Sequence, residues 1–268
     1  MNDESTSRGA TWLAALTEDG APVAGYPASV RVVDAALAGE PCRYVAVLPD
    51  PANPFPRART GEVGVVEGWA LARAIHEVIA ADRNIRRRAI VAVVDVSSQA
   101  YGRREEAFGI HEALAGAAGA YAQARLAGHP VIGLIVGKAM SGAFLAHGYQ
   151  ANRLIALNDS GVMVHAMGKA AAARVTLRSV EDLERLAADV PPMAYDIASF
   201  ASLGLLWKLL DVQKPDQPGD DDLAAVRLAL EDARRDILDD TSRDLRGRLG
   251  GLNRQASSRV RERLAAQW

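Results

Sequence analysis

The segment from Pro130 to Gly148 constrains the fold more than any other part of the chain. An apolar run rich in Val and Ile covers Val131–Gly137, a turn of small residues follows at Lys138–Gly142, and an apolar helix starts at Ala143. Strands buried on both faces have this Val and Ile content, and the first turn of a helix leaves backbone N–H groups without partners. The segment therefore predicts a strand–turn–helix junction whose N–H groups could hold an oxyanion.

A second unit of the same kind precedes this segment. Helical spacing of apolar residues predicts a helix over Val65–Ala81, and Val and Ile content predicts a buried strand over Ala89–Val96. A polar loop, Ser97–Arg104, leads into a long predicted helix over Glu105–Leu126. Seven of the eight residues in Ala113–Ala120 are Ala or Gly, so neighbouring elements can pack very close to this helix.

The two units together predict an α/β fold with one site. Parallel strands end at the same edge of a sheet, and ligands bind there. We therefore expect the loops Ser97–Arg104 and Gly137–Gly142 to lie side by side and to form one site. The remaining predicted strands are Ser29–Val33, Arg43–Leu48, Arg153–Leu157 and Gly161–His165, and the remaining predicted helices are Ser179–Ala188, Met193–Leu210 and most of the chain after residue 219, with a break at Gly250-Gly251.

Composition excludes several classes of protein. The 268 residues are 49% hydrophobic, which suits one large domain with its own core. We expect a single domain over residues 1–268, with a core at about 28–212 and a helical extension at about 219–268. The lone Cys42 excludes a disulfide framework, and no histidine has the spacing of a metal ligand, so we expect no metal. A net charge of −2, no apolar leader and no 18-residue apolar run predict a cytoplasmic protein that binds neither nucleic acid nor membrane.

Four short motifs, in this order, resemble the carboxyltransferase branch of the crotonase-like superfamily, which also contains the Clp proteases. They are Gln99-Ala100-Tyr101-Gly102, Glu105-Glu106, Gly137–Ala143 and Val164–Gly168. In that branch an Ala-Tyr-Pro-Gly-type loop precedes paired Glu, a Gly-rich turn and a Ser-Pro-Glu-Gly strand end. The resemblance covers about Glu62–Leu230 and implies a spiral of ββα units with C-terminal helices.

Three differences from that pattern indicate one family within the branch. Ala139-Met140 and Gly142-Ala143 replace Gly-Gly pairs, and His165-Ala166-Met167-Gly168 replaces Ser-Pro-Glu-Gly. In this form the chain resembles the gamma subunit of biotin-independent malonate decarboxylase. The resemblance implies a carboxy-lyase that is active only with a beta-like subunit. Its substrate would be a malonyl thioester on the phosphopantetheine-type group of an acyl carrier protein, and this chain would bind no cofactor itself.

The same resemblance supplies the candidate site residues. The catalytic candidates are Met140, Ser141, Gly142 and His165, and the substrate-binding candidates are Tyr101, Gly102, Lys138, Ala139, Met167 and Gly168. The N–H groups of Ala139–Gly142 would face the departing carboxylate or a proton donor. Methionine side chains would make the pocket apolar, which favours loss of a charged carboxylate.

Three alternatives stay open at this stage. In a Clp-like serine peptidase, Ser141 would be the nucleophile and His165 the base, oriented by Asp211 or Asp216. A biotin-dependent acyl-CoA carboxyltransferase subunit would share the fold. A non-catalytic assembly subunit would have lost the Gly-rich turns.

Charge is unevenly distributed along the chain. Pro215–Asp240 holds nine acidic and three basic residues, whereas Thr241–Trp268 holds seven Arg and two acidic residues. Because carrier proteins are generally acidic, we expect a basic docking surface. Arg86–Arg88, Arg103-Arg104 and the Arg-rich C-terminus are the candidates for it.

Overall fold

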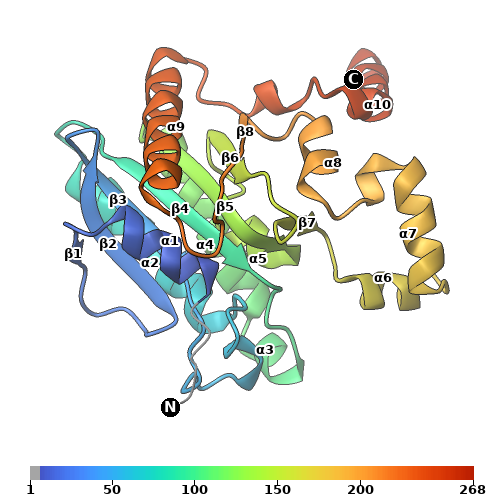
Figure 1. Cartoon of the computed structure of the whole chain (residues 1–268), viewed down its shortest axis with the longest axis horizontal. Coiled ribbons are helices and arrows are strands. Elements are labelled where there is room, and N and C mark those ends of the chain that lie inside the picture. Colours follow the sequence, from blue (N-terminus) through green and yellow to red (C-terminus); the bar gives the residue numbers. More distant parts are fainter. Residues whose placement is uncertain (1–6) are drawn as a thin grey trace.

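One mixed β-sheet organises residues 7–268, the part of the chain that the computed structural model describes (Figure 1). Its strand order is β1-β2-β3-β4-β5-β6-β8, and β7 pairs with β5. The first three strands pair antiparallel and the others pair parallel. The strands are β1 (Ala21–Pro22), β2 (Val30–Leu37), β3 (Glu40–Val47), β4 (Ala89–Val96), β5 (Val131–Met140), β6 (Arg153–Leu157), β7 (Met163–His165) and β8 (Lys208–Leu210).

Helices cover both faces of the sheet. Helices α1 and α9 contact each other and the strands on one face, and α2, α4 and α5 pack behind the sheet in the view of Figure 1. The helices are α1 (Arg8–Leu16), α2 (Val65–Ala81), α3 (Arg103–Ala107), α4 (Ile110–Leu126), α5 (Ser141–Ala146), α6 (Lys169–Val175), α7 (Val180–Asp189), α8 (Ile197–Ser202), α9 (Asp220–Asp239) and α10 (Gln255–Gln267), with short 3₁₀ turns at Pro56–Ala58, Pro191–Met193, Arg246–Arg248 and Leu252–Arg254.

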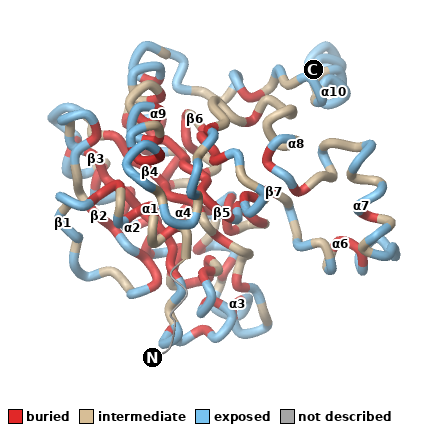
Figure 2. Tube along the Cα trace, in the orientation of Figure 1, coloured by how far each residue is buried: buried red, intermediate tan, exposed pale blue. Residues whose placement is uncertain are grey.

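The core follows from the two central strands. All but one residue of β4 and all but one of β5 are buried, because helices cover both faces of these parallel strands. One continuous apolar core runs from Trp12 in α1 to Ile237 in α9. In Figure 2 the buried residues gather in the sheet and the helices against it, whereas α6 and α7 have few buried residues and α10 is mostly exposed. Helix α9 is thus part of the core, and α10 has no buried residue.

Helices α2 and α4 pack unusually close together, as the Ala and Gly content predicts. A Cβ atom on Gly68 of α2 would lie 2.8 Å from the carbonyl carbon and oxygen of Ala113 in α4. The helix backbones meet at this point, and only glycine fits there.

The boundaries predicted for α2, β4 and β6 are confirmed, and several others are wrong. The predicted helix over Glu105–Leu126 is interrupted at Gly109, whose φ of 74° separates α3 from α4. The predicted helix over Met193–Leu210 is wrong, because α8 ends at Ser202 and the segment then pairs with β6 as β8. Strand β5 continues to Met140, through most of the predicted turn, since its end pairs with β7. Helices α1 and α6 were not predicted.

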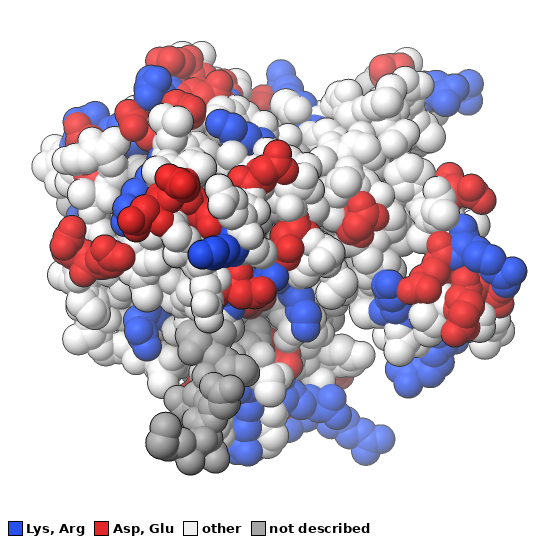
Figure 3. Space-filling view, in the orientation of Figure 1, with Lys and Arg blue, Asp and Glu red and all other residues white. Residues whose placement is uncertain are grey.

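The acidic stretch predicted from Pro215 to Asp240 is partly neutralised in α9 and the turn after it. Arg153 of β6 binds Asp236 and Asp240, and Arg235 lies within ion-pair distance of Glu231 and Asp232. Figure 3 shows basic side chains among the acidic ones in the region of α9.

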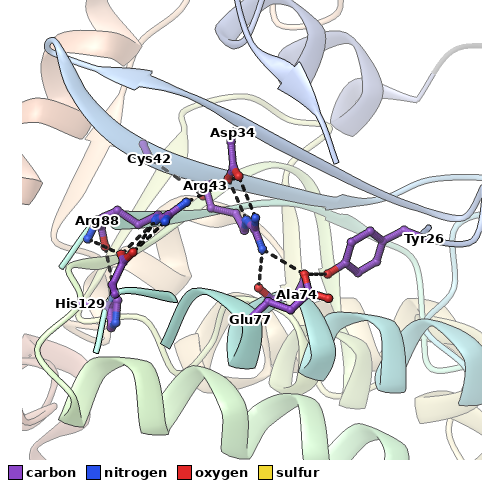
Figure 4. Close-up of polar contacts among 9 residues, drawn as sticks. Tyr26, Asp34, Cys42, Arg43, Ala74, Glu77, Arg88 and His129 are labelled. Atoms are coloured by element: carbon purple, nitrogen blue, oxygen red, sulfur yellow. Dashed lines mark hydrogen bonds and ion pairs between the residues drawn. The ribbon is translucent and has the colours of Figure 1, made fainter. Parts of the chain in front are cut away.

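A polar network ties the antiparallel edge of the sheet to α2 (Figure 4). Arg43 of β3 makes two hydrogen bonds to Asp34 of β2, at 2.8 and 2.7 Å, and donates to the Ala74 carbonyl of α2. Arg88 holds the buried Asp82 with both its backbone and its guanidinium group, which keeps the pKa of that carboxyl below its usual value despite burial. These arginines therefore serve the fold.

Candidate active site

A cavity of about 320 Å³ lies where β5 passes into α5 and β7 ends. It brings together three of the four predicted catalytic residues, Ser141, Gly142 and His165. Most of the other lining side chains are apolar, so the cavity is partly shielded from water. The lining residues are Ser141, Gly142, Phe144, Leu145, Tyr149, Val164, His165, Ala166, Pro191, Pro192, Ala194, Phe200, Leu203 and Leu205.

Ser141 occupies a strained backbone position at the start of α5. Its φ of 59° lies in the left-handed region, which costs an ordinary residue roughly 1–2 kcal/mol. The hydroxyl Oγ donates a hydrogen bond of 2.8 Å to the carbonyl of Ala166, just after β7. The sharp turn thus carries the chain from strand to helix and fixes the serine at the wall of the cavity.

The N–H of Gly142 has a partner, which corrects the prediction of unpaired groups in this turn. The side-chain oxygen Oε1 of Gln99 accepts from this N–H at 2.7 Å. Since Oε1 faces the donor, the amide nitrogen of Gln99 points elsewhere and keeps its two donors. Sequence reasoning placed Gln99 in the right loop but did not select it as a site residue. This hydrogen bond confirms the expectation that the Ser97–Arg104 loop and the Gly137–Gly142 segment meet.

Gly137, near the end of β5, leaves space for a neighbouring side chain. The carboxylate of Asp95 fills the space above Gly137 and accepts hydrogen bonds from the N–H groups of Lys138 and Gly9, at 3.0 and 3.1 Å. The glycine therefore admits a structural carboxylate that ties α1 to the end of β5. It does not leave room for a ligand.

His165 is held in the wall of the cavity by its backbone neighbours and one aromatic ring. Its Nδ1 lies 2.9 Å from the carbonyl oxygen and 3.2 Å from the nitrogen of Met167. Its ring stacks on Tyr195 with centroids 3.9 Å apart and planes 15° apart. Partial burial lowers the pKa of His165 below 6.5, so the imidazole is neutral near pH 7. Tyr195 was not identified from the sequence.

The predicted apolar methionines lie behind this wall and do not line the cavity. Met140 forms a small cluster with Leu183 and Tyr195, and Met167 packs against it. Tyr195, on which His165 stacks, belongs to this cluster. The methionines therefore help to hold the ring that supports the imidazole.

The six predicted binding residues lie outside the lining of the cavity. Ala139 is fully buried in the sheet between Val96 and Val164. Lys138 lines a separate surface hollow with Asp95, and Met167 packs in the cluster behind His165. Tyr101 is 52% exposed, whereas Gly102 and Gly168 precede α3 and α6. The structure thus brings together three of the four predicted catalytic residues at the cavity and places the predicted binding residues elsewhere.

The geometry does not support a serine peptidase. Ser141 donates to Ala166, and Nδ1 of His165 is engaged by Met167. Of the two aspartates considered for the relay, Asp211 accepts from Asn158 and Asp216 from Arg8. Within residues 7–268, no serine–histidine–aspartate relay is assembled.

Two further findings concern metal ligands and membrane-spanning helices. In the described part of the chain, no group of three or more His, Cys, Asp and Glu side chains could hold a metal ion. None of its helices is both long and apolar enough to span a bilayer.

The sheet, the strand-to-helix turn and the cavity together define a crotonase-like protein of the carboxyltransferase type. Transcarboxylase 12S with hydrolysed methylmalonyl-coenzyme A shares this fold, with a TM-score of 0.62 at 22% identity over 84% of this chain and 40% of that chain. The model of the malonate decarboxylase gamma subunit matches residues 58–268, and the chain belongs to that family.

Three relatives show how close this relationship is. The Pseudomonas malonate decarboxylase hetero-tetramer in complex with coenzyme A contains a chain that is 67% identical, with a TM-score of 0.94, over 98% of this chain and 100% of that chain. The Pseudomonas MdcD–MdcE hetero-dimer contains one that is 65% identical, with a TM-score of 0.90 over the same shares. The malonyl-S-ACP:biotin-protein carboxyltransferase MADD of Malonomonas rubra is 34% identical over 161 residues, 59% of this chain. The chain spans about half (55%) of the length of that curated relative.

Proposed function

We propose that this chain is the gamma-type half of a biotin-independent malonate decarboxylase. With a beta-like subunit it would convert malonyl-S-acyl carrier protein to acetyl-S-acyl carrier protein and CO₂. Family membership and the similarity to chains of Pseudomonas malonate decarboxylase over nearly the whole length support this proposal. The substrate would arrive on the phosphopantetheine-type group of the carrier, and this chain would contribute side chains and backbone groups only.

We also propose a domain organisation and a cellular location for this chain. One continuous apolar core supports a single domain over residues 1–268. A cytoplasmic location suits a chain with one cysteine, which is buried.

The chemistry of the proposed reaction matches the cavity. Loss of CO₂ breaks the bond between the carboxylate carbon and Cα and leaves an enolate, which then takes up a proton at Cα. An apolar cavity disfavours the charged carboxylate and so favours its loss. The neutral imidazole of His165 faces this cavity and can exchange a proton through Nε2, which has no partner among the described residues.

The hydrogen bond from Gly142 to Gln99 is the observation from which we infer which subunit binds which part of the substrate. An oxyanion hole needs N–H donors that are free to bind the developing charge. In this chain the N–H of Gly142 is already bound to Oε1 of Gln99. We therefore assign the thioester oxygen to the beta-like subunit, while Ser141, His165 and the amide group of Gln99 act on the carboxylate side. The remaining candidates would then act through the shape of the turns around the site; they are Tyr101, Gly102, Lys138, Ala139, Met140, Met167 and Gly168.

CO₂ release from a malonyl thioester tests the proposed function. The chain is assayed alone and co-purified with a beta-like subunit, each with and without avidin, which removes biotin. We expect release only from the complex and no effect of avidin. Inhibition by avidin would indicate a biotin-dependent carboxyltransferase, and no release by the complex would refute the proposal.

Two variants of Gln99 test its role in that complex. Gln99→Ala removes both the acceptor for Gly142 and the amide donors that would bind the carboxylate, and we expect kcat to fall on the order of a hundredfold, the size of effect typical of one lost donor in an active site. Gln99→Glu retains an acceptor for the N–H but lacks the donors. Equal activity of Gln99→Ala and wild type in an intact complex would show that Gln99 has no part in the reaction, as would be true of a non-catalytic wall.

A further inference from the structure

Four exposed arginines surround α3 and the 3₁₀ turn at Pro56–Ala58. We call them the α3 arginine patch: Arg57, Arg59, Arg103 and Arg104. None of the four has a carboxylate within ion-pair distance in the described chain, where the ion pairs involve other cations. Of the two glutamates of α3, Glu105 is buried and Glu106 is exposed. The half-buried Glu62 accepts hydrogen bonds from Thr60 and Ser97. Positive charge therefore dominates this surface.

Aromatic side chains pack against the patch and beside it. The guanidinium group of Arg104 lies 4.9 Å from the ring centroid of Phe55 and donates to the carbonyl of Pro54. Phe108 packs edge-on against Phe55, with centroids 5.7 Å apart, yet remains 62% exposed. Exposed Tyr101 stands in the same loop. Arginines combined with aromatic side chains are typical of protein–protein interfaces.

One hydrogen bond links the segment that carries the patch to the candidate active site. Gln99, in the loop that leads through Tyr101 into α3, accepts from the N–H of Gly142, which lines the cavity. A partner bound to the patch would thus contact the segment whose first residues hold the turn at the cavity. A thioester on a flexible arm of that partner could reach the cavity from there.

The other arginine clusters predicted from the sequence are committed elsewhere or are remote. Arg86 pairs with Glu40, Arg87 donates to backbone carbonyls, and Arg88 holds Asp82. In the C-terminal segment, Arg248 is buried on the carbonyls of Tyr149 and Ala151. The arginines of α10 are exposed, but α10 and α3 lie at opposite ends of the molecule (Figure 1). At the lower edge of Figure 3, where α3 lies, Lys and Arg side chains gather on the surface.

We propose that the α3 arginine patch is the surface on which an acidic acyl carrier protein docks to deliver its malonyl thioester. This inference rests on the proposed function and adds where the partner binds. Charges at the rim of an interface mainly change the rate of association and its dependence on salt. The patch is therefore expected to determine KM for the carrier-bound substrate and to leave kcat unchanged.

The test compares two substrates and two pairs of charge reversals in the complex with the beta-like subunit. The substrates are malonyl-carrier protein and the small thioester malonyl-pantetheine. We expect Arg57→Glu with Arg103→Glu to raise KM for malonyl-carrier protein on the order of tenfold at low salt, and to leave KM for malonyl-pantetheine within about twofold. The matched control reverses Arg259 and Arg261 on α10 and should leave both KM values unchanged.

The outcomes separate this inference from the function on which it rests. No CO₂ from either substrate with the wild-type complex would refute the proposed function. Normal KM for malonyl-carrier protein in the α3 variant, or a larger effect of the α10 control, would refute the docking surface. Failure of the α3 variant to co-purify with the beta-like subunit would overturn it as well, since the patch would then belong to the subunit interface.

Discussion

Replacing Gly68 by alanine should separate two helices behind the sheet. The new Cβ would lie 2.8 Å from the carbonyl carbon and oxygen of Ala113 and 2.9 Å from its Cβ. These are mainly backbone atoms of α4, which cannot move aside as a flexible side chain could. Overpacking of a core costs about 1–3 kcal/mol, and the rigid neighbour places this site at the upper end of that range.

The higher helix propensity of alanine offsets part of this loss in the free energy of unfolding. Alanine is about 1 kcal/mol more favourable than glycine in a helix interior. The expected loss in the free energy of unfolding is therefore about 1–2 kcal/mol. For a chain of this size that lowers the melting temperature by roughly 2–8 °C.

Gly119→Ala in α4 is a matched control that should raise the free energy of unfolding. A Cβ there meets no atom within 4 Å, so Gly119→Ala should gain the propensity difference alone. We expect stabilisation by up to about 1 kcal/mol. Urea unfolding followed by circular dichroism, on the chain and on the complex with its partner, measures both variants. A Gly68→Ala chain as stable as wild type would refute the argument from the helix contact.

Two further predictions concern the surroundings of the site. Gly137→Ala should displace the Asp95 carboxylate from the N–H groups of Lys138 and Gly9, and destabilise the chain by about 1–3 kcal/mol in urea unfolding; an unchanged midpoint would contradict this. Burial lowers the pKa of His147 to about 4, whereas the unfolded chain keeps the ordinary 6.5. The unfolded state therefore binds the extra proton, so the free energy of unfolding should be highest above pH 6.5 and fall as the pH drops from about 6.5 to about 4. His147→Gln, whose amide can still bond Val93 and Tyr121, should make this slope shallower; an identical slope would refute the assignment.

Local sequence patterns were sufficient to predict several elements of this protein. Val and Ile content predicted β4, the short apolar run Arg153–Leu157 was predicted as the strand β6, and apolar spacing predicted α2 with its observed bounds. The small residues of α4 predicted that a neighbouring element packs close to it, and this element is α2. The order of four short motifs indicated the family, which the match over residues 58–268 confirms. Ser141, Gly142 and His165 were brought together as predicted, because each lies at the end of a strand that pairs in parallel with its neighbour.

Tertiary structure alone decided the features that depend on distant partners. Lys208–Leu210 is a strand because β6, more than fifty residues earlier in the chain, offers it an edge, although its apolar residues suit a helix equally well. The acceptor for Gly142 comes from Gln99, and the group above Gly137 comes from Asp95. The arginines were alike in sequence, yet Arg86 and Arg88 pair with nearby carboxylates, whereas the α3 arginine patch has no carboxylate partner among the described residues. Hydrogen bonds and ion pairs between segments far apart in the chain leave no periodic pattern in the sequence, so only folding reveals which polar groups are satisfied and which are available to a partner.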